Sequence, residues 1–225
     1  MCPAALLVVG ERGSQVLDER GFDAWAQDYD ESVARSEEAN AYPFAGYERV
    51  MDAIYAKVIG RGARRVLDLG FGTATLTTRL YEAGCEVFGQ DFSGRMVEVA
   101  REKMPVAHLY QGDLADGLVP ELGGRRYDAI VATYSLHHLD DARKVALILK
   151  LMGLLSPRGS IHIGDVAFET RAELGACQRL VGDAWDADEA YFVCEELRQS
   201  LPGLTFERAS FCAGVITIPF AGSTE

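Results

Sequence analysis

The sequence predicts an α/β protein built around one mainly parallel β-sheet. From residue 65 onward, short apolar runs alternate with amphipathic segments of helical periodicity, which is the pattern of strands joined by helical crossovers. The run at residues 128–134, DAIVATY, is almost wholly apolar, as expected for a strand that is covered on both faces. Three successive runs end in an acid, namely Asp68, Asp91 and Asp113, and such ends meet at one edge of a parallel sheet.

Each element can be placed from apolar spacing and from the residues that begin and end helices. Strands are expected at residues 65–70, 85–92, 106–113, 127–136 and 160–168, and helices at residues 73–84, 94–104 and 140–155. Ser93 is a candidate N-cap for the second of these helices. Residues 170–200 are expected to be helical. The runs at 204–210 and 211–220 are joined too closely for a helical crossover, so they are expected to pair antiparallel.

We expect one domain, with a helical N-terminal cap at residues 1–60 and an α/β core at residues 61–225. The cap carries a series of aromatic residues: Trp25, Tyr29, Tyr42, Phe44 and Tyr47. Such side chains either pack a cap onto a core or form a lid that closes over a ligand and excludes water. The sequence leaves both interpretations open. Trp185 and Tyr191 are expected to border the same pocket from the other side.

Charge and composition narrow the class of partners. The 225 residues include 22 Lys and Arg against 34 Asp and Glu, giving a formal net charge of −12, which disfavours broad binding to nucleic acid or to an anionic membrane. The acidic run at residues 186–190 is expected to be a solvated face. The five cysteines form no CxxC pair, so neither a zinc site nor a disulfide framework is expected. No metal is predicted, and the absence of a targeting or membrane-spanning run favours a cytoplasmic location.

A glycine pair, Gly70 and Gly72, follows the first expected strand. Glycine permits close approach of a ligand to the backbone, and the helix that follows offers N–H groups at its N-terminus. A dinucleotide fingerprint needs a further glycine where Thr75 stands, and it gives no role to Asp68. A carboxylate at Asp68 suits a ligand with an ammonium group better than a pyrophosphate. The residues therefore favour another adenosine cofactor, with Asp91 placed to bind its ribose.

The ordered set of motifs resembles the class I S-adenosylmethionine-dependent methyltransferases, in particular small bacterial enzymes with a methyltransferase domain. VLDLGFGTAT, at residues 66–75, is similar to their first motif, GQDFSGRM to the second, and QGDL to the third. YDAIVATYSLHHL is similar to their fourth strand and the loop after it, and WAQDYD and YPFAGYE near the N-terminus add to the resemblance. The resemblance implies a Rossmann-like three-layer α/β/α sandwich, whose seven-stranded sheet has only its last strand antiparallel.

The resemblance also implies roles at the cofactor, S-adenosylmethionine, and at its product, S-adenosylhomocysteine. Asp68 and the backbone of Gly70 and Gly72, with Phe71 between them, would hold the methionine moiety. The other implied contacts are Asp91 to the ribose hydroxyls, Phe92 and Met96 around the adenine, Asp113 and Leu114 at the adenine amino group and ring, and Thr133 and Tyr134 under the sulfonium. Two residues depart from the family pattern, because Phe71 is bulky and Ala74 replaces a third glycine.

Candidates for chemistry lie after the fourth and fifth strands. Methyl transfer from a sulfonium needs a positioned nucleophile, and a hydroxyl acceptor would also gain from a general base. His137, His138 and Asp165 are candidates for that base. Each can equally be an ordinary loop residue, with a histidine paired to Asp140 or to the backbone. The catalytic residue therefore stays open.

The sequence predicts an S-adenosylmethionine-dependent methyltransferase that acts on a small molecule. An NAD-type oxidoreductase is an alternative, but no Tyr-x-x-x-Lys or comparable set for hydride transfer is present. A second alternative is a non-catalytic protein that binds S-adenosylmethionine and acts through a partner. The sequence does not identify the acceptor, and it leaves the oligomeric state open, a homodimer included.

Overall fold

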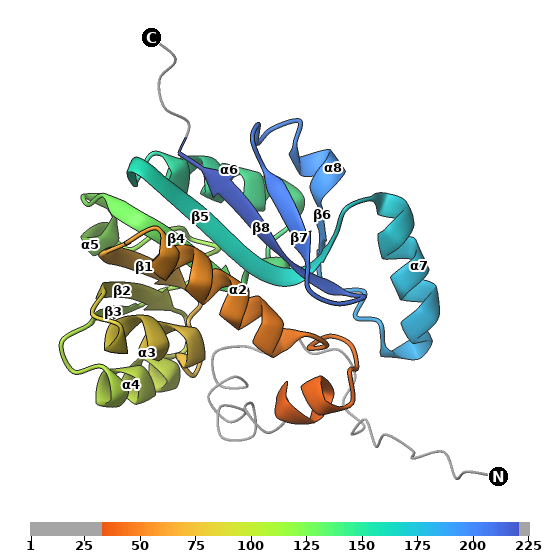
Figure 1. The fold of residues 1–225 in the computed structure, drawn as a ribbon, viewed down its shortest axis with the longest axis horizontal. Coiled ribbons are helices and arrows are strands. Elements are labelled where there is room, and N and C mark those ends of the chain that lie inside the picture. The colour runs from red at the N-terminus through yellow and green to blue at the C-terminus, as the bar shows by residue number, and fades with distance from the viewer. Residues whose placement is uncertain (1–32, 221–225) are drawn as a thin grey trace.

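The framework of the molecule is one twisted sheet, shown in Figure 1. The computed structural model describes residues 33–220. Seven strands lie in the order β3-β2-β1-β4-β5-β8-β7, and a two-residue strand, β6, pairs with the end of β5. The pairs among β1 to β5 are parallel, and β8 is antiparallel to both of its neighbours. The predicted mostly parallel sheet with one antiparallel strand is confirmed, and β6 is an addition to it.

The strands and helices have the following bounds. The strands are β1 (Arg65–Leu69), β2 (Glu86–Asp91), β3 (His108–Gln111), β4 (Tyr127–Thr133), β5 (Leu155–Phe168), β6 (Phe192–Val193), β7 (Thr205–Arg208) and β8 (Ala213–Pro219). The helices are α2 (Tyr47–Gly60), α3 (Thr75–Glu82), α4 (Gly94–Lys103), α5 (Pro120–Gly123), α6 (Asp141–Met152), α7 (Arg171–Val181) and α8 (Cys194–Leu197). Two 3-10 turns are η1 (Leu136–His138) and η2 (Gly182–Ala184), and residues 33–38 are also helical.

The predicted elements of the core are confirmed to within a few residues, with two corrections. β5 begins at Leu155 rather than at residue 160, because SPRG forms an irregular pairing with β4, with Arg158 at φ 75°. Residues 170–200 are not one helical region. α7 ends at Val181, directly before Gly182 with φ 56°, and a 3-10 turn, β6 and the short α8 follow. The predicted N-cap is confirmed, since the Ser93 hydroxyl accepts from the Met96 N–H.

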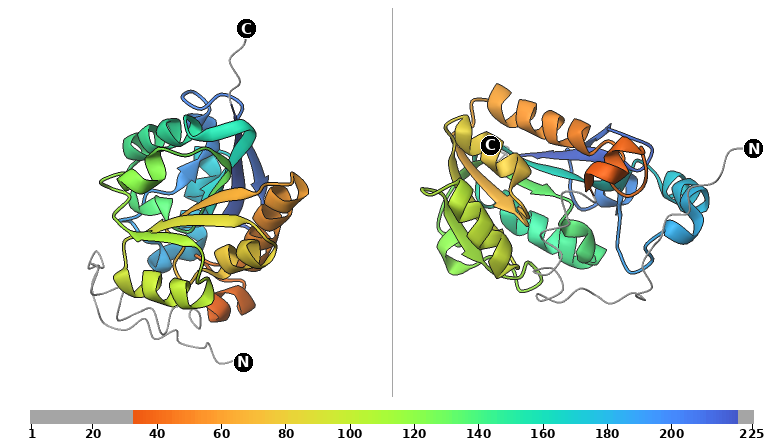
Figure 2. Two further views of the ribbon diagram at one scale, coloured as in Figure 1. Left: turned by 90° about the vertical axis from the view of Figure 1, so that its left-hand side faces the viewer. Right: turned by 90° about the horizontal axis from the view of Figure 1, so that it is seen from below.

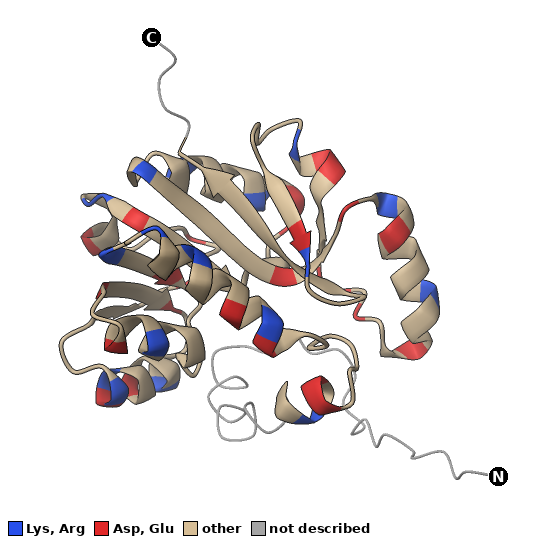
Figure 3. Ribbon diagram, in the orientation of Figure 1, with Lys and Arg blue, Asp and Glu red and all other residues tan. Residues whose placement is uncertain are grey.

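Helices cover both faces of the sheet, so the predicted three-layer arrangement is confirmed. One buried apolar cluster gathers side chains of α2, α3 and α4 against β1 to β4, and a second gathers those of α5, α6 and α8 on the other face. Figure 2 shows α2 and α6 on opposite sides of the sheet. In the view of Figure 3, basic and acidic residues are interspersed along α2, α4 and α7. Within residues 33–220, no helix has both the length and the apolar character needed to cross a membrane.

α2 packs directly onto the sheet at a glycine. A Cβ built at Gly164 in β5 would lie 2.3 Å from Cγ1 of Val50 and 2.9 Å from Cδ1 of Ile54, so only glycine permits this approach. The helix thereby holds the turn before it close to the end of β4. This part of the predicted cap is therefore a layer of the sandwich. Trp25 and Tyr29 lie outside the described residues.

Candidate active site

A cavity of about 1160 Å³ lies at the carboxyl ends of the parallel strands. In open α/β sheets this edge, next to the point where strand order reverses, is where ligands bind, and here the reversal falls between β1 and β4. Single-ligand pockets usually measure ~300–1,000 Å³, so this cavity has room for more than one small molecule.

The cavity has two halves that come from different parts of the chain. We call the part at the ends of β1, β2 and β3 the sheet half; its lining includes Gly70, Gly72, Asp91 and Asp113. We call the other part the loop half; its lining includes Tyr42, His137, Asp186, Asp188, Glu189 and Tyr191. The loop half is built by the turn before α2, the loop after β4 and residues 182–191.

Most residues predicted to bind the cofactor do line this cavity. The lining includes Gly70, Phe71, Gly72, Asp91, Phe92, Met96, Asp113, Leu114, Thr133 and Tyr134. Tyr42, Phe44 and Tyr47 of the cap line it as well, and so do His137 and His138. Asp68 and Asp165 do not, because both side chains are buried behind lining residues.

The two glycines of the loop after β1 are required for different reasons. Both have positive φ, 68° at Gly70 and 52° at Gly72, which favours glycine. A Cβ built at Gly70 would lie 2.4 Å from Cβ of Ser135, whose hydroxyl donates to the carbonyl of Leu69 at 2.7 Å. A Cβ at Gly72 would meet nothing within 4 Å. Gly70 therefore permits packing against the loop after β4, whereas Gly72 leaves backbone open to a ligand.

Asp91 ties the glycine loop to the next strand. Its Oδ2 accepts from the Gly72 N–H at 2.8 Å, and its Oδ1 accepts from the Ser93 N–H at 3.0 Å. The side chain is 3% exposed, so this carboxylate is fixed at the floor of the sheet half. Asp113, after β3, is exposed and accepts from the Ala115 N–H at 2.8 Å.

Asp68 lies under the glycine loop rather than in the cavity. Its Oδ2 accepts from the Thr77 hydroxyl at 2.6 Å, and its Oδ1 has no hydrogen-bond partner among the described residues. Burial, against the lowering effect of the Thr77 hydrogen bond and with a smaller contribution from the charge of Asp91, raises the pKa of this carboxyl to about 7. Any influence of Asp68 on a ligand would therefore pass through the loop, which makes it a candidate positioning residue.

The two departures from the family pattern have local explanations. The Phe71 ring is 5% exposed and packs over β2, where a Cβ built at Gly89 would lie 2.7 Å from its Cδ1. Phe71 thus turns mainly into the core while still reaching the cavity wall. Ala74 takes the position of a third glycine in the left-handed conformation, with φ 64°, directly before α3.

Aromatic residues of the cap pack against residues from the core. The Tyr134 ring stacks on Tyr47 at 5.4 Å between centroids and lies 5.2 Å from Phe44. Tyr42 stacks on Trp185 at 5.5 Å, and its hydroxyl hydrogen-bonds to that of Tyr191. Tyr42, Phe44 and Tyr47 therefore form a wall of the cavity, and Tyr191 lines it beside Tyr42. Trp185 does not line the cavity but packs against both Tyr42 and Tyr191.

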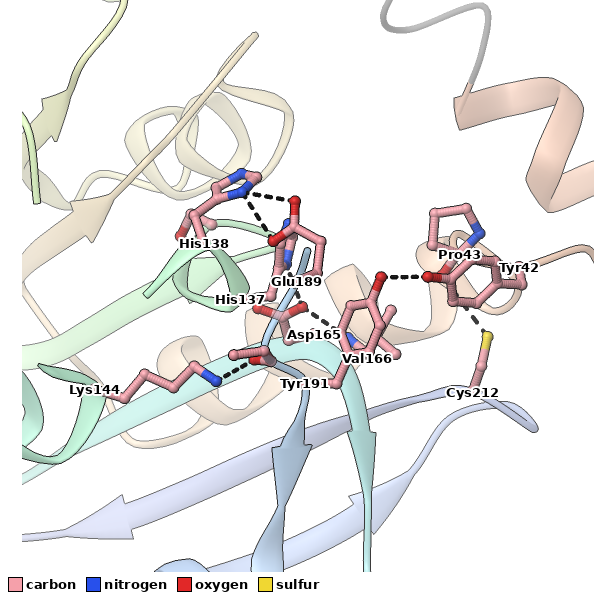
Figure 4. A network of polar contacts seen from close by, with 12 residues as sticks. Tyr42, Pro43, His137, His138, Lys144, Asp165, Val166, Glu189, Tyr191 and Cys212 are labelled. Carbon is pink, nitrogen blue, oxygen red and sulfur yellow. Dashed lines mark hydrogen bonds and ion pairs between the residues drawn. The ribbon is translucent and has the colours of Figure 1, made fainter. Parts of the chain in front are cut away.

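Two histidines after β4 are each paired with a carboxylate, as Figure 4 shows. Nδ1 of His137 lies 2.7 Å from Oδ1 of Asp165, and Nδ1 of His138 lies 3.0 Å from Oε1 of Glu189. Burial alone would lower the pKa of His137, but the charge of Asp165 and its hydrogen bond outweigh burial, so that pKa is raised. Glu189 is also partly buried, which would raise its pKa, yet the His138 hydrogen bond keeps that pKa below its ordinary value.

His137, His138 and Glu189 are also close enough to share a cation. Among the described residues, they form a group whose potential ligand atoms all lie within 4.8 Å of one another. Within this group Nδ1 of His138 is bound to Glu189, whereas Nδ1 of His137 is bound to Asp165, outside the group.

The sequence interpretation missed part of the loop half. Residues 186–190 were expected to form a solvated face; Asp186 and Asp188 are indeed exposed, but together with Glu189 they also line the cavity. Ser135 was not singled out either, although it fixes the need for Gly70. The position of the acidic run between Trp185 and Tyr191 could have indicated that it lines the cavity. No local pattern in the sequence marks Ser135.

Comparisons with known proteins agree with this geometry. A family model described as a methyltransferase domain matches residues 66–159. An uncharacterized methyltransferase of Anoxybacillus flavithermus is 37% identical over 150 residues, which cover 67% of this chain and 68% of that protein.

Two solved structures resemble the fold. Magnesium protoporphyrin IX methyltransferase from Synechocystis PCC 6803, with bound S-adenosylhomocysteine, has a TM-score of 0.63 at 19% identity and covers 90% of this chain and 99% of its own. The N-methyltransferase NodS from Bradyrhizobium japonicum WM9, also with S-adenosylhomocysteine, has a TM-score of 0.57 at 16% identity and covers 87% and 98%. Both confirm the predicted Rossmann-like fold.

Proposed function

The chain belongs to the methyltransferase domain family, and on that premise we propose that it binds S-adenosylmethionine and transfers the methyl group to a small molecule. One observation carries the proposal: the glycine loop, Asp91 and Asp113 meet in a single cavity. Its second half is lined by tyrosine, histidine and acidic side chains. When bound, S-adenosylmethionine supplies a methyl group made electrophilic by a sulfonium. A cytoplasmic location, expected from the sequence, belongs to this proposal.

The sheet half fits the cofactor by its chemistry. Gly72 leaves open space beside the backbone, which suits close approach of the methionine moiety. A carboxylate can accept several hydrogen bonds, so Asp91 can take ribose hydroxyls while it holds the loop. Met96, Phe92 and Leu114 supply apolar side chains for an adenine ring. S-adenosylmethionine is cationic at sulfur, and the acids of this half favour a cation.

His137 is placed to take a proton from an acceptor. The Asp165 carboxylate binds Nδ1, which favours the tautomer with hydrogen on Nδ1 and leaves Nε2 as the basic nitrogen. The His137 side chain lines the cavity, whereas Asp165 is fully buried behind it. We therefore assign His137 as the proposed base and Asp165 as the residue that positions it.

The family comparison gives no support to an oxidoreductase. The relative and the matching family model are both methyltransferases by name. Magnesium protoporphyrin IX methyltransferase is named for a small molecule, and NodS is named an N-methyltransferase. These names favour a small acceptor here but differ in chemistry, so the acceptor has to be inferred from this chain's own residues.

Calorimetry with S-adenosylhomocysteine and with NAD tests the proposal. We expect S-adenosylhomocysteine alone to bind, and Asp91→Asn to weaken it by about tenfold or more because a charged acceptor is lost. Asp116→Asn, which changes an acid outside the cavity lining, is the matched control and should bind normally. Binding of NAD, or unchanged affinity in Asp91→Asn, would contradict the assignment. Binding without release of S-adenosylhomocysteine from S-adenosylmethionine across a broad acceptor set would favour the non-catalytic alternative.

A further inference from the structure

The loop half of the cavity is lined by acidic residues. Among the described residues, no Lys or Arg lines the cavity, whereas Asp186, Asp188 and Glu189 line this half. An anionic acceptor would meet like charge there without a partner to neutralise it. A cleft lined by one sign of charge concentrates ligands of the opposite sign.

The charges behind the lining do not reverse this sign. Asp165 adds a fourth carboxylate, bound to His137. Lys144 is the ammonium whose charge acts on both His137 and Glu189, and it is fully buried. Its Nζ is bonded to the Ala190 carbonyl and to Asp141, and it lies 4.5 Å from the centre of the Phe192 ring. Four carboxylates thus face one ammonium and two imidazoles, so the region stays negative even with both imidazoles protonated.

The same half also has aromatic walls. Tyr42 and Tyr191 line it, and Trp185 supports both, stacked on Tyr42 and edge-on to Tyr191 at 4.9 Å. Aromatic faces attract organic cations and also bury apolar groups. Acids beside aromatic rings therefore suit a ligand that carries a positive charge on an apolar body.

On the basis of the proposed function, we propose that the loop half binds the methyl acceptor as a cation, and that the acceptor is a small organic amine. Asp186, Asp188 and Glu189 attract the ammonium form, and Tyr42 and Tyr191 contact its apolar part. His137 stands on the side toward the end of β4, where the amine would turn toward the sheet half. The inference deepens the proposed methyl transfer by naming the class of acceptor.

The proposed methyl transfer to an amine balances protons and electrons with residues that are present. The ammonium form first loses a proton to Nε2 of a neutral His137, which exposes the nitrogen lone pair. That nitrogen forms a bond to the methyl carbon while the carbon–sulfur bond breaks, and the bonding electron pair stays on sulfur as a neutral thioether. The methylated amine leaves as a cation, and the imidazolium proton passes to solvent.

Two matched sets of probes test the acceptor class on protein saturated with S-adenosylhomocysteine. The first set is phenethylamine, phenethyl alcohol and hydrocinnamate, and the second is butylamine, butanol and butyrate. Within a set the size is similar and the charge changes from positive to neutral to negative. We expect the amine of at least one set to bind about tenfold or more tightly than its alcohol and acid, because charge-assisted hydrogen bonds are the stronger ones.

Variants separate this inference from the proposed function. In the double variant Asp186→Asn/Asp188→Asn, we expect the preference for the amine to fall about tenfold while S-adenosylhomocysteine binds normally. Asp183→Asn removes an acid of the same segment that does not line the cavity, and it should retain the preference. Failure of wild type to bind S-adenosylhomocysteine would reject the proposed function itself. Normal cofactor binding with equal binding of amine and alcohol, tighter binding of the acid, or no amine binding in either set would overturn only the amine assignment.

Discussion

The two halves of the cavity are held in place by different physics. In the sheet half, backbone geometry sets the shape: two glycines with positive φ, a strand-end carboxylate bound to two backbone N–H groups, and close contact between neighbouring loops. In the loop half, side chains from distant segments meet through hydroxyl, imidazole and carboxylate groups. Steric contacts determine the shape of the sheet half, so few substitutions are tolerated there. The shape of the loop half depends on side-chain interactions that can be removed one at a time.

This difference predicts where substitutions act. A change in the sheet half should alter the stability of the whole domain or the affinity for the cofactor. A change in the loop half should alter acceptor binding with a modest cost in stability. Four experiments test this division, from the largest expected effect to the smallest.

Gly70→Ala should destabilise the protein most, by about 4 kcal/mol. Its Cβ would clash with Ser135 at 2.4 Å, which adds an overpacking cost of ~1–3 kcal/mol to a left-handed-conformation cost of ~1–2 kcal/mol. Gly72→Ala carries only the second cost, but it should weaken S-adenosylhomocysteine binding because its methyl group enters the open space. Urea unfolding and calorimetry on the two variants measure both effects.

Ser135→Gly provides the control for this pair. Added to Gly70→Ala, it removes the atoms that clash, so it should restore part of the lost stability. Equal destabilisation by Gly70→Ala and Gly72→Ala, or no rescue by Ser135→Gly, would mean that steric contact between the loops does not distinguish the two glycines.

Asp68→Asn should change how stability depends on pH. The folded pKa of Asp68, about 7, lies above its ordinary value of 3.8, so the folded state binds the proton more tightly. The contribution of Asp68 to the free energy of unfolding is then highest at low pH and falls as pH rises from about 4 to about 7. Between about pH 5 and pH 7 it falls by about 2 kcal/mol. Asparagine removes this titration, so its curve should be flatter there. Parallel curves for the two proteins would show that Asp68 does not titrate in this range.

Asp165→Asn should cost about 1.5 kcal/mol, the size of a hydrogen bond to a charged group, and the cost should depend on pH. The pKa of His137 is raised when folded, because its bond to Asp165 outweighs the burial that would lower it. The contribution of the pair is therefore fully present below the ordinary histidine value of about 6.5 and is lost as pH rises through the raised value. Unfolding of both proteins across this window should show a stability difference that shrinks with rising pH. A difference independent of pH would argue against an ion pair.

Tyr42→Phe should have the smallest effect, about 1 kcal/mol of stability. It removes the hydroxyl that bonds to Tyr191 and accepts from the Asp186 N–H at 3.2 Å, but it keeps the ring on Trp185. Affinity for S-adenosylhomocysteine should not change, whereas affinity for an amine probe should fall. Weaker cofactor binding in this variant would show that the two halves are coupled, which would contradict the division between them.

The same contrast explains how much the sequence could predict. Gly70, Gly72 and Asp91 act within one strand–loop–strand unit, so the local motif and strand pattern place all three. The partners in the loop half are far apart along the chain: His138 and Glu189 are separated by 51 positions in sequence number, and Tyr42 and Tyr191 by 149. No local periodicity encodes such a pairing, which is why an acidic run that lines a cavity resembles an ordinary solvated one.

The contact between the turn before α2 and the end of the chain has a consequence for synthesis. Cys212, beside β8, reaches the Pro43 carbonyl with its sulfur at 3.7 Å, and a Cβ at Gly46 would lie 2.8 Å from Cβ of Ser210. A ribosome builds the chain from its N-terminus, at a rate of about 5–20 residues per second. Cys212 and Ser210 are therefore synthesised roughly ten seconds or more after the turn that they contact, and well after β1 to β4. The loop half of the cavity is thus completed only after the C-terminal strands are made, later than the strands that carry the sheet half.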